Sequence, residues 1–143
     1  MTNSIRWCFV LVPVLWAGGL TLAQVDPTKV LIGTWEGQAE TLKGYDQILI
    51  INSVKAKGDG EWVARGRFGP RALTSTGPGG QEMAVTSKNN EIYIEFLAKG
   101  KDPVRLKLVN DNRLEGTINI ILKRAIDRRI WLEKVVPKAG DVK

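Results

Sequence analysis

Hydrophobic and polar residues alternate along most of the chain after residue 32, and a period of two predicts β-strands. The alternation is clear over residues 61–68, where Trp62, Ala64, Gly66 and Phe68 share the face expected to point into the core. The same pattern, applied along the whole chain, predicts eight strands. Their ranges are 33–40, 45–55, 61–68, 81–87, 91–98, 104–108, 113–122 and 127–136.

Short turn signals separate most of these strands, with Asp59-Gly60 and Asn89-Asn90 among them. No stretch keeps a helical period over three turns, although a short helical turn from Pro27 into Leu31 is compatible with the sequence. Consecutive tight hairpins favour a meander, and closing a meander removes its exposed edges. We therefore predict an all-β fold, an eight-stranded antiparallel up-and-down (meander) barrel.

The longest connection, residues 69–80, is rich in Gly and Pro. Functional loops have this composition, and so do loops with no role beyond connecting strands. The sequence leaves both interpretations open.

The N-terminal residues 1–23 are typical of a signal peptide, with Arg6 before an apolar run and small residues after it. Cleavage is expected after Ala23, so that the mature chain begins at Gln24 and is periplasmic or extracellular. A retained membrane anchor is the alternative, but the uncharged stretch falls short of the ~20 residues that a spanning helix needs. Contact with the membrane is then expected only transiently, through the signal peptide. The remaining chain divides into a barrel domain, 24–136, and a polar tail, 137–143.

Composition narrows the classes of function. The formal net charge is +6, but Lys and Arg are scattered and form no basic stripe with interleaved aromatic residues, so nucleic acid is not an expected partner. The chain has no His, and its single Cys, Cys8, lies in the predicted signal peptide. A mature chain without His or Cys has no disulfide and no Cys/His zinc site, and no imidazole to activate a nucleophile. We expect neither an enzyme nor a metal or other cofactor, and the sequence indicates no particular protein partner.

Two short motifs give a family resemblance. Gly33-Thr34-Trp35 resembles the first-strand Gly-x-Trp of the calycins, the lipocalins and fatty-acid-binding proteins, here in a pared-down secreted bacterial form. Arg129-Ile130-Trp131 resembles the Arg-x-Tyr at the end of the fatty-acid-binding proteins. The helix pair of the fatty-acid-binding proteins and the long C-terminal helix of the lipocalins have no counterpart in this sequence.

The resemblance implies roles for residues at both ends of the barrel domain. Gly33 and Trp35 would close one end of the barrel, and Arg128 or Arg129 would pack on the Trp35 indole by a cation–π contact. Arg129 and Trp131 would hold the positions that meet a ligand carboxylate, although Trp lacks the hydroxyl of Tyr.

Only one Arg of the pair can point inward, because side chains alternate along a strand. Arg128 shares its face with two aliphatic residues, whereas Arg129 fits the Arg-x-aromatic spacing of the resemblance. We expect Arg129 to point inward on that spacing.

Two functions fit these predictions. In the first, the barrel binds a small apolar or amphipathic ligand, anionic ligands included, through the five residues Trp62, Phe68, Phe96, Arg129 and Trp131. In the second, side chains fill the barrel, and the protein is a non-enzymatic structural or interaction module of the cell envelope. A void near ~300 Å³ that opens to solvent would favour the first.

Overall fold

The computed structural model describes residues 25–40, 46–74, 80–121 and 125–136. The predicted signal peptide, its cleavage site and the polar tail lie outside these residues. The described elements, in chain order, are α1 (Pro27–Val30), β1 (Gly33–Ala39), β2 (Asp46–Gly58), β3 (Glu61–Pro70), the 3₁₀ turn η1 (Arg71–Leu73), β4 (Gln81–Lys88), β5 (Glu91–Ala98), β6 (Asp102–Asn110), β7 (Arg113–Ile121) and β8 (Ala125–Lys134).

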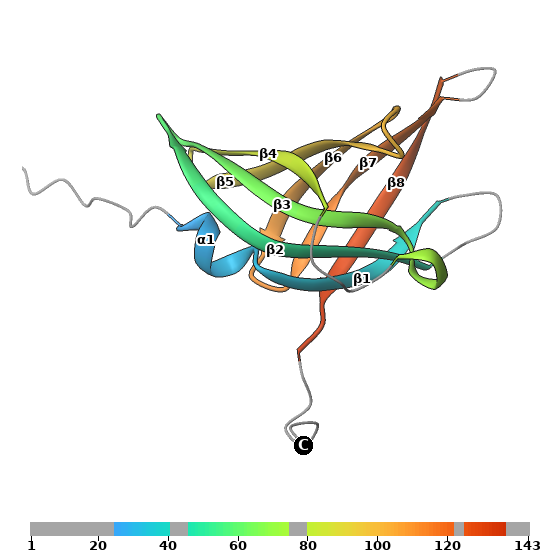
Figure 1. Cartoon of the computed structure of the whole chain (residues 1–143), viewed down its shortest axis with the longest axis horizontal. Coiled ribbons are helices and arrows are strands. Elements are labelled where there is room, and N and C mark those ends of the chain that lie inside the picture. The colour runs from blue at the N-terminus through green and yellow to red at the C-terminus, as the bar shows by residue number, and fades with distance from the viewer. Residues whose placement is uncertain (1–24, 41–45, 75–79, 122–124, 137–143) are drawn as a thin grey trace, which may run out of the picture.

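The eight strands form one closed antiparallel barrel (Figure 1). Each strand pairs with the next in the sequence. The sheet is closed by β1 and β8, which pair from Trp35 opposite Lys134 to Ala39 opposite Ile130. The predicted all-β, eight-stranded up-and-down barrel is confirmed. Closure leaves no strand of the barrel at an open edge, which explains how so many short strands form one stable sheet.

Tight hairpins connect the strands where the sequence predicts them. Asp59 and Gly60 both have positive φ between β2 and β3, and Asn89 and Asn90 both have positive φ between β4 and β5. Two consecutive residues with positive φ are the signature of a type I′ turn, whose twist matches that of the flanking strands. Gly, Asn and Asp tolerate this conformation, so local sequence sets these turns.

The apolar run over residues 48–51 is buried on both faces of β2. Leu49 belongs to the barrel core, whereas Ile48 and Ile50 belong to the opposite, outer face. There η1 packs against β2, and Arg71 of η1 makes an ion pair of 3.0 Å with Glu36 of β1. The outer cover explains why β2 departs from simple alternation.

β6 begins two residues earlier than predicted, at Asp102. The sequence places Asp102 and Pro103 in a turn, but Pro103 pairs with Leu97 of β5 and its side chain lies on the exposed face. A Pro near the start of a strand is tolerated there. As a result, Asp102 joins Val104 and Leu106 on the inward face of β6.

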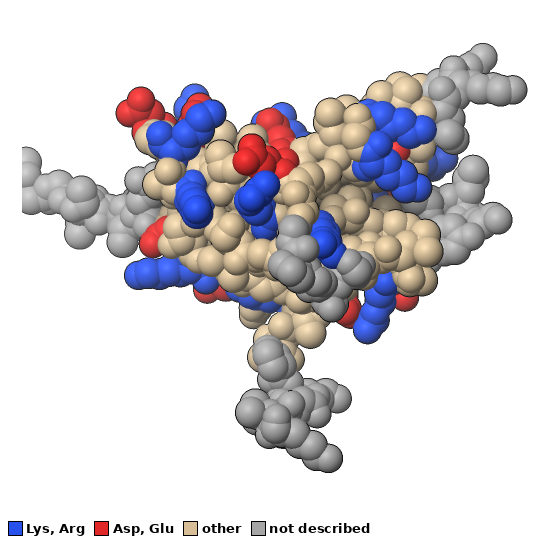
Figure 2. All heavy atoms as spheres, in the orientation of Figure 1, with Lys and Arg blue, Asp and Glu red and all other residues tan. Residues whose placement is uncertain are grey.

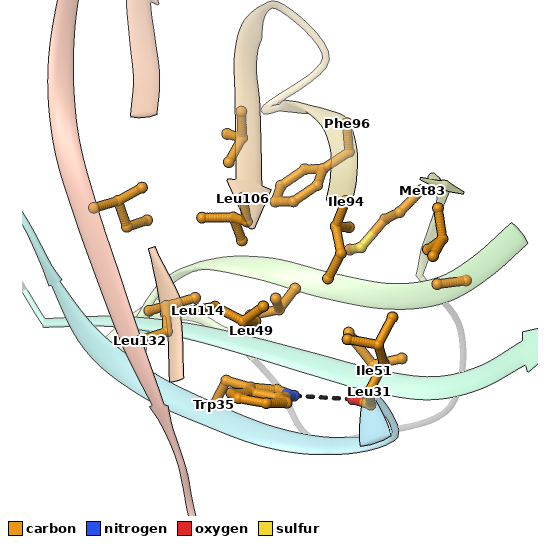
Figure 3. Close-up of a cluster of buried hydrophobic side chains, with 14 of the residues drawn as sticks. Leu31, Trp35, Leu49, Ile51, Met83, Ile94, Phe96, Leu106, Leu114 and Leu132 are labelled. Carbon is orange, nitrogen blue, oxygen red and sulfur yellow. Dashed lines mark hydrogen bonds between the residues drawn. The ribbon is translucent and has the colours of Figure 1, made fainter. Parts of the chain in front are cut away.

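The core fills the barrel with aliphatic side chains from its inward faces (Figure 3). Ala64 is fully buried and Gly66 is buried, while Trp62 and Phe68 are partly buried against the core, so the predicted inward face of the third strand is confirmed. The largest fully buried side chains include Leu49, Ile94, Leu106, Leu114 and Leu132.

Candidate functional site at the open end of the barrel

One end of the barrel, which we call the closed end, is sealed by α1 and Trp35. The Trp35 side chain is fully buried, and its Nε1–H donates a hydrogen bond of 2.9 Å to the Leu31 carbonyl (Figure 3). The α1 turn that precedes Leu31 is capped by Asp26, whose carboxylate accepts hydrogen bonds from the Thr28 hydroxyl and backbone N–H. These two bonds lower the pKa of Asp26. The end of this turn thus places the Leu31 carbonyl where it accepts the hydrogen bond of the indole N–H.

Lys134 supplies the cation that lies over the Trp35 ring. Its Nζ is 5.2 Å from the ring centroid and donates a hydrogen bond of 2.6 Å to the Val30 carbonyl. Gly33 leaves room for it, because a Cβ there would lie 3.2 Å from Lys134 Cε. The expectation that Arg128 or Arg129 packs on this indole is therefore wrong, since Lys134 is the direct cross-strand neighbour of Trp35 in the β1–β8 register.

Lys134→Met tests this closure. Met keeps the aliphatic length but loses the charge, so we expect a loss of about 1 kcal/mol of unfolding free energy in urea denaturation. The matched control is Lys29→Met, because the Lys29 side chain is exposed in α1. A loss no larger than that of the control would show that the charge over Trp35 adds nothing to stability.

At three inward glycines the backbone of the paired strand approaches closely. A Cβ at Gly37 would collide with the Trp131 carbonyl, one at Gly66 with the Ile50 carbonyl, and one at Gly116 with the Arg105 carbonyl. The neighbouring strand backbone already occupies the space that these glycines leave, so they serve close strand approach and strong coiling of the sheet.

The other end of the barrel, the open end, holds a cavity of about 370 Å³, which we call the mouth cavity. It is formed where β2 begins, where β3 and β7 end, and at the turn from β5 to β6. Its lining residues are Gln47, Phe68, Gly69, Pro70, Leu73, Thr74, Ala98, Lys99, Asp102, Ile118 and Ile120. The cavity exceeds the ~300 Å³ at the lower end of known ligand pockets.

Among the described residues, the β3–β4 ladder ends before Phe68, beside the mouth cavity. β3 continues to Pro70, whereas its pairing with β4 stops at Gly66 and Gln81. A second hollow of about 330 Å³ lies at this gap and shares Phe68 and Thr74 with the mouth cavity. Both hollows also share Leu73, whose side chain is 82% exposed, so the site has access to solvent.

Two buried polar side chains, Gln47 and Asp102, lie among the apolar residues of this lining. Each is 7% exposed. Asp102 Oδ1 accepts a hydrogen bond of 2.9 Å from the Ile121 backbone N–H, at the end of β7. The site therefore combines apolar walls with a buried amide and a buried, hydrogen-bonded carboxylate, and specific small-molecule pockets have the same combination.

Of the predicted ligand residues, the structure brings Phe68 and Phe96 together. Their rings meet edge to face, with centroids 5.2 Å apart and an interplanar angle of 63°. Phe68 lines the mouth cavity, whereas Phe96 is buried behind the Phe68 ring and does not line the cavity. Trp62 lies six residues before Phe68 on β3, about 20 Å along the strand, and does not line the cavity.

Arg129 and Trp131 do not point into the barrel, so that expectation is corrected. Ile130 and Leu132 are buried at 1% and 0% exposure, and alternation then places Arg129 and Trp131 on the outer face. Burying the two aliphatic side chains decides the orientation of β8. Arg128 shares the inward face and is partly buried.

Arg129 and Trp131 instead line a groove of about 860 Å³ on the outer surface, over β6, β7 and β8. Ion pairs cross the same surface, including Arg113 with Glu133 at 3.0 Å and Lys107 with Glu91 at 2.5 Å. Hydrogen bonding between Lys107 and Glu91 lowers the pKa of Glu91 and raises that of Lys107. A hydrogen bond to Glu91 raises the pKa of the neighbouring Tyr93 hydroxyl. On the face shown in Figure 2, basic and acidic side chains are likewise interspersed.

Sequence reasoning missed the polar residues of the mouth cavity. Asp102 and Pro103 form a dipeptide typical of turns, and for that reason Asp102 was not assigned to a strand. The inward alternation of Val104 and Leu106 extends back to Asp102, and that extension could have placed this carboxylate inside the barrel. Nothing comparable marks Gln47, which lies next to a run of apolar residues.

The chain matches no protein-family model, and a search of curated proteins finds no match. Among the described residues, no helix is both long and apolar enough to span a membrane. The described residues also contain no group of three or more acidic, His or Cys side chains that could hold a metal ion. The geometry of the mouth cavity is therefore the basis for assigning a function.

Proposed function

We propose that this protein is an exported, lipocalin-like barrel that binds a small apolar or amphipathic molecule in the mouth cavity. The observation that carries the proposal is the cavity of about 370 Å³ at the one end of the barrel that Trp35 and α1 do not seal. Phe68, Ile118 and Ile120 supply apolar walls, and burial of a ligand's apolar surface against them drives binding.

The size of the cavity limits the ligand. About 370 Å³ corresponds to roughly a dozen water molecules at liquid density, so a ligand with a short chain or a single ring fits. A long fatty acid would need the middle of the barrel, where Leu106 and Leu114 are fully buried.

The lipocalin-like part of the proposal rests on the Gly33-Thr34-Trp35 motif at the start of a closed eight-stranded barrel. Export rests on the signal-peptide pattern of residues 1–23. An anionic ligand was inferred from an inward Arg129, and the outward direction of that side chain removes the basis for it.

Filling the mouth cavity tests the binding proposal. Ala98 lines the cavity at 5% exposure, so the ring of Ala98→Phe would take the space of a ligand. We expect affinity for 1-hexanol, measured by NMR titration, to fall about tenfold or more. In the matched control, Leu97→Phe, the ring lies on the outer face, where Leu97 is 49% exposed, and affinity should stay unchanged. Equal affinity of both variants would place the hexanol outside the cavity.

Native mass spectrometry of the protein purified from its natural source tests export and binding together. The mass of the polypeptide shows whether the chain begins at Gln24, and additional mass that is lost on activation identifies a bound molecule. An intact N-terminus on soluble protein would rule out cleavage after Ala23.

A second candidate function is supported by the outer groove of about 860 Å³. Trp131 and Arg129 are residue types that recur in protein interfaces. The protein would then act through this surface as a structural or interaction module of the envelope, with its barrel as a filled scaffold. Failure of the wild-type protein to bind any small apolar probe would favour this function.

A further inference from the structure

We propose that the ligand of the mouth cavity carries a cationic amine, which pairs with Asp102 while an apolar body packs against Phe68, Ile118 and Ile120. This inference rests on the proposed binding function and specifies the ligand class. It reverses the charge expected from the sequence, because the buried charged side chain in the lining is a carboxylate.

The position of Asp102 leaves part of its carboxylate available. Asp102 is the first residue of β6, belongs to the inward face and is 7% exposed. Its Oδ1 accepts the Ile121 N–H at 2.9 Å, which fixes the side chain against the end of β7. No ion pair joins Asp102 to a Lys or Arg within the described parts of the chain. Oδ2 is therefore the atom that can accept a hydrogen bond from a ligand.

A buried carboxylate with a single backbone hydrogen bond is energetically unfavourable. Burying a charge is unfavourable unless it is paired and hydrogen-bonded. An ammonium group supplies both an opposite charge and N–H donors, and charge-assisted hydrogen bonds are the stronger kind. The apolar walls strengthen the attraction, because they lower the local dielectric constant around the pair. An anionic ligand in the same cavity would meet repulsion from Asp102.

The basic residues near the mouth make the sign of the ligand testable. Lys99 lines the rim, is exposed, and lies beyond ion-pair distance of Asp102. Arg128 pairs with Ile118 across β7 and β8 but is not part of the lining. Lys99 would repel a cationic ligand and attract an anionic one. Its removal therefore changes affinity in opposite directions for the two ligand classes.

Three probes of equal chain length separate charge from apolar contact: hexylammonium, 1-hexanol and hexanoate. We expect wild-type protein to bind hexylammonium most tightly, as measured by NMR titration at one fixed ionic strength. Asp102→Asn should lower the affinity for hexylammonium about tenfold or more and change the affinity for 1-hexanol by less than about twofold. Asn retains a carbonyl that can accept the Ile121 N–H, so the end of β7 keeps its partner. Lys99→Met should strengthen hexylammonium binding.

The outcomes distinguish this inference from the proposed function. Three results would each overturn the cationic ligand. The first is that hexanoate binds most tightly, and the second is that Asp102→Asn loses equal affinity for hexylammonium and for 1-hexanol. The third is that Lys99→Met binds hexylammonium more weakly than wild-type protein does. If wild-type protein binds all three probes equally, the cavity is a binding site without charge selection, and only the inference fails. If it binds none, both fail. If Asp102→Asn does not fold, the direction of the Lys99→Met effect decides alone.

Discussion

Trp35→Ala is expected to lower the free energy of unfolding by about 3–5 kcal/mol, because it removes a fully buried aromatic side chain from the closed end. The substitution leaves a cavity beneath α1, and it removes the donor that satisfies the Leu31 carbonyl and the ring under Lys134. Denaturation should be followed by far-UV circular dichroism, since the change also removes a fluorophore.

The matched control is Trp131→Ala, which deletes the same ring from the outer face of β8. That ring is partly exposed, so its removal should cost about 1 kcal/mol or less. A Trp35→Ala loss below about 1 kcal/mol, or one equal to the control, would mean that Trp35 does not close the barrel. It would also remove the main residue-level support for the lipocalin-like resemblance.

The barrel could be predicted from the sequence because its strands are locally consistent. Residues 91–96 alternate, and Ile92, Ile94 and Phe96 are all buried as that alternation predicts. The turns are equally local, since Asn89-Asn90 carries its own preference for positive φ. Many short strands with tight turns then leave few topologies other than a meander.

The orientation of β8 was predicted wrongly because the resemblance was preferred to the local pattern. One face carries Arg128 with two aliphatic residues and the other carries Arg129 with Trp131 and Glu133, and the aliphatic face is the one that is buried. The register with β1 gives the same orientation, because Lys134 lies beside Trp35 and shares its face. Ile130 and Leu132 follow on that face into the core. The aliphatic pattern of β8 and its register with β1 therefore agree that Arg129 points outward.

The mouth cavity was hidden from sequence analysis for a different reason. Its lining comes from residues far apart in the chain, and it forms because β3 continues after its pairing with β4 has ended. Asp102 is buried, and Ile121, at the end of β7, donates its backbone N–H to the carboxylate. A charged residue beside a Pro is locally typical of an exposed turn. Alternation extended back from Val104 could have placed Asp102 on the inward face, but its contact with Ile121 depends on the pairing of β6 with β7.

An inward glycine in a barrel strand leaves space either for a ligand or for neighbouring groups. The structure supports the second at Gly116, which packs against the backbone of β6. Its lack of a Cβ lets β6 and β7 approach where the barrel wall bends. The glycine is thus a condition for closure, and it contributes no volume to the mouth cavity.

Gly116→Ala should therefore be strongly destabilising, by about 3 kcal/mol, since the new Cβ would collide with the Arg105 carbonyl and lie 2.9 Å from Leu106 Cα. These are backbone atoms of a paired strand, so relief requires β6 to move. Gly100→Ala is the control: its φ of +71° is unfavourable for Ala, but apart from Gly100 itself and its two neighbours in the chain no atom is found within 4 Å of the new Cβ. That strain alone should cost about 1 kcal/mol. Urea denaturation of both variants measures the difference, and equal losses would show that β6 and β7 are not in the close contact on which the bend of the barrel depends.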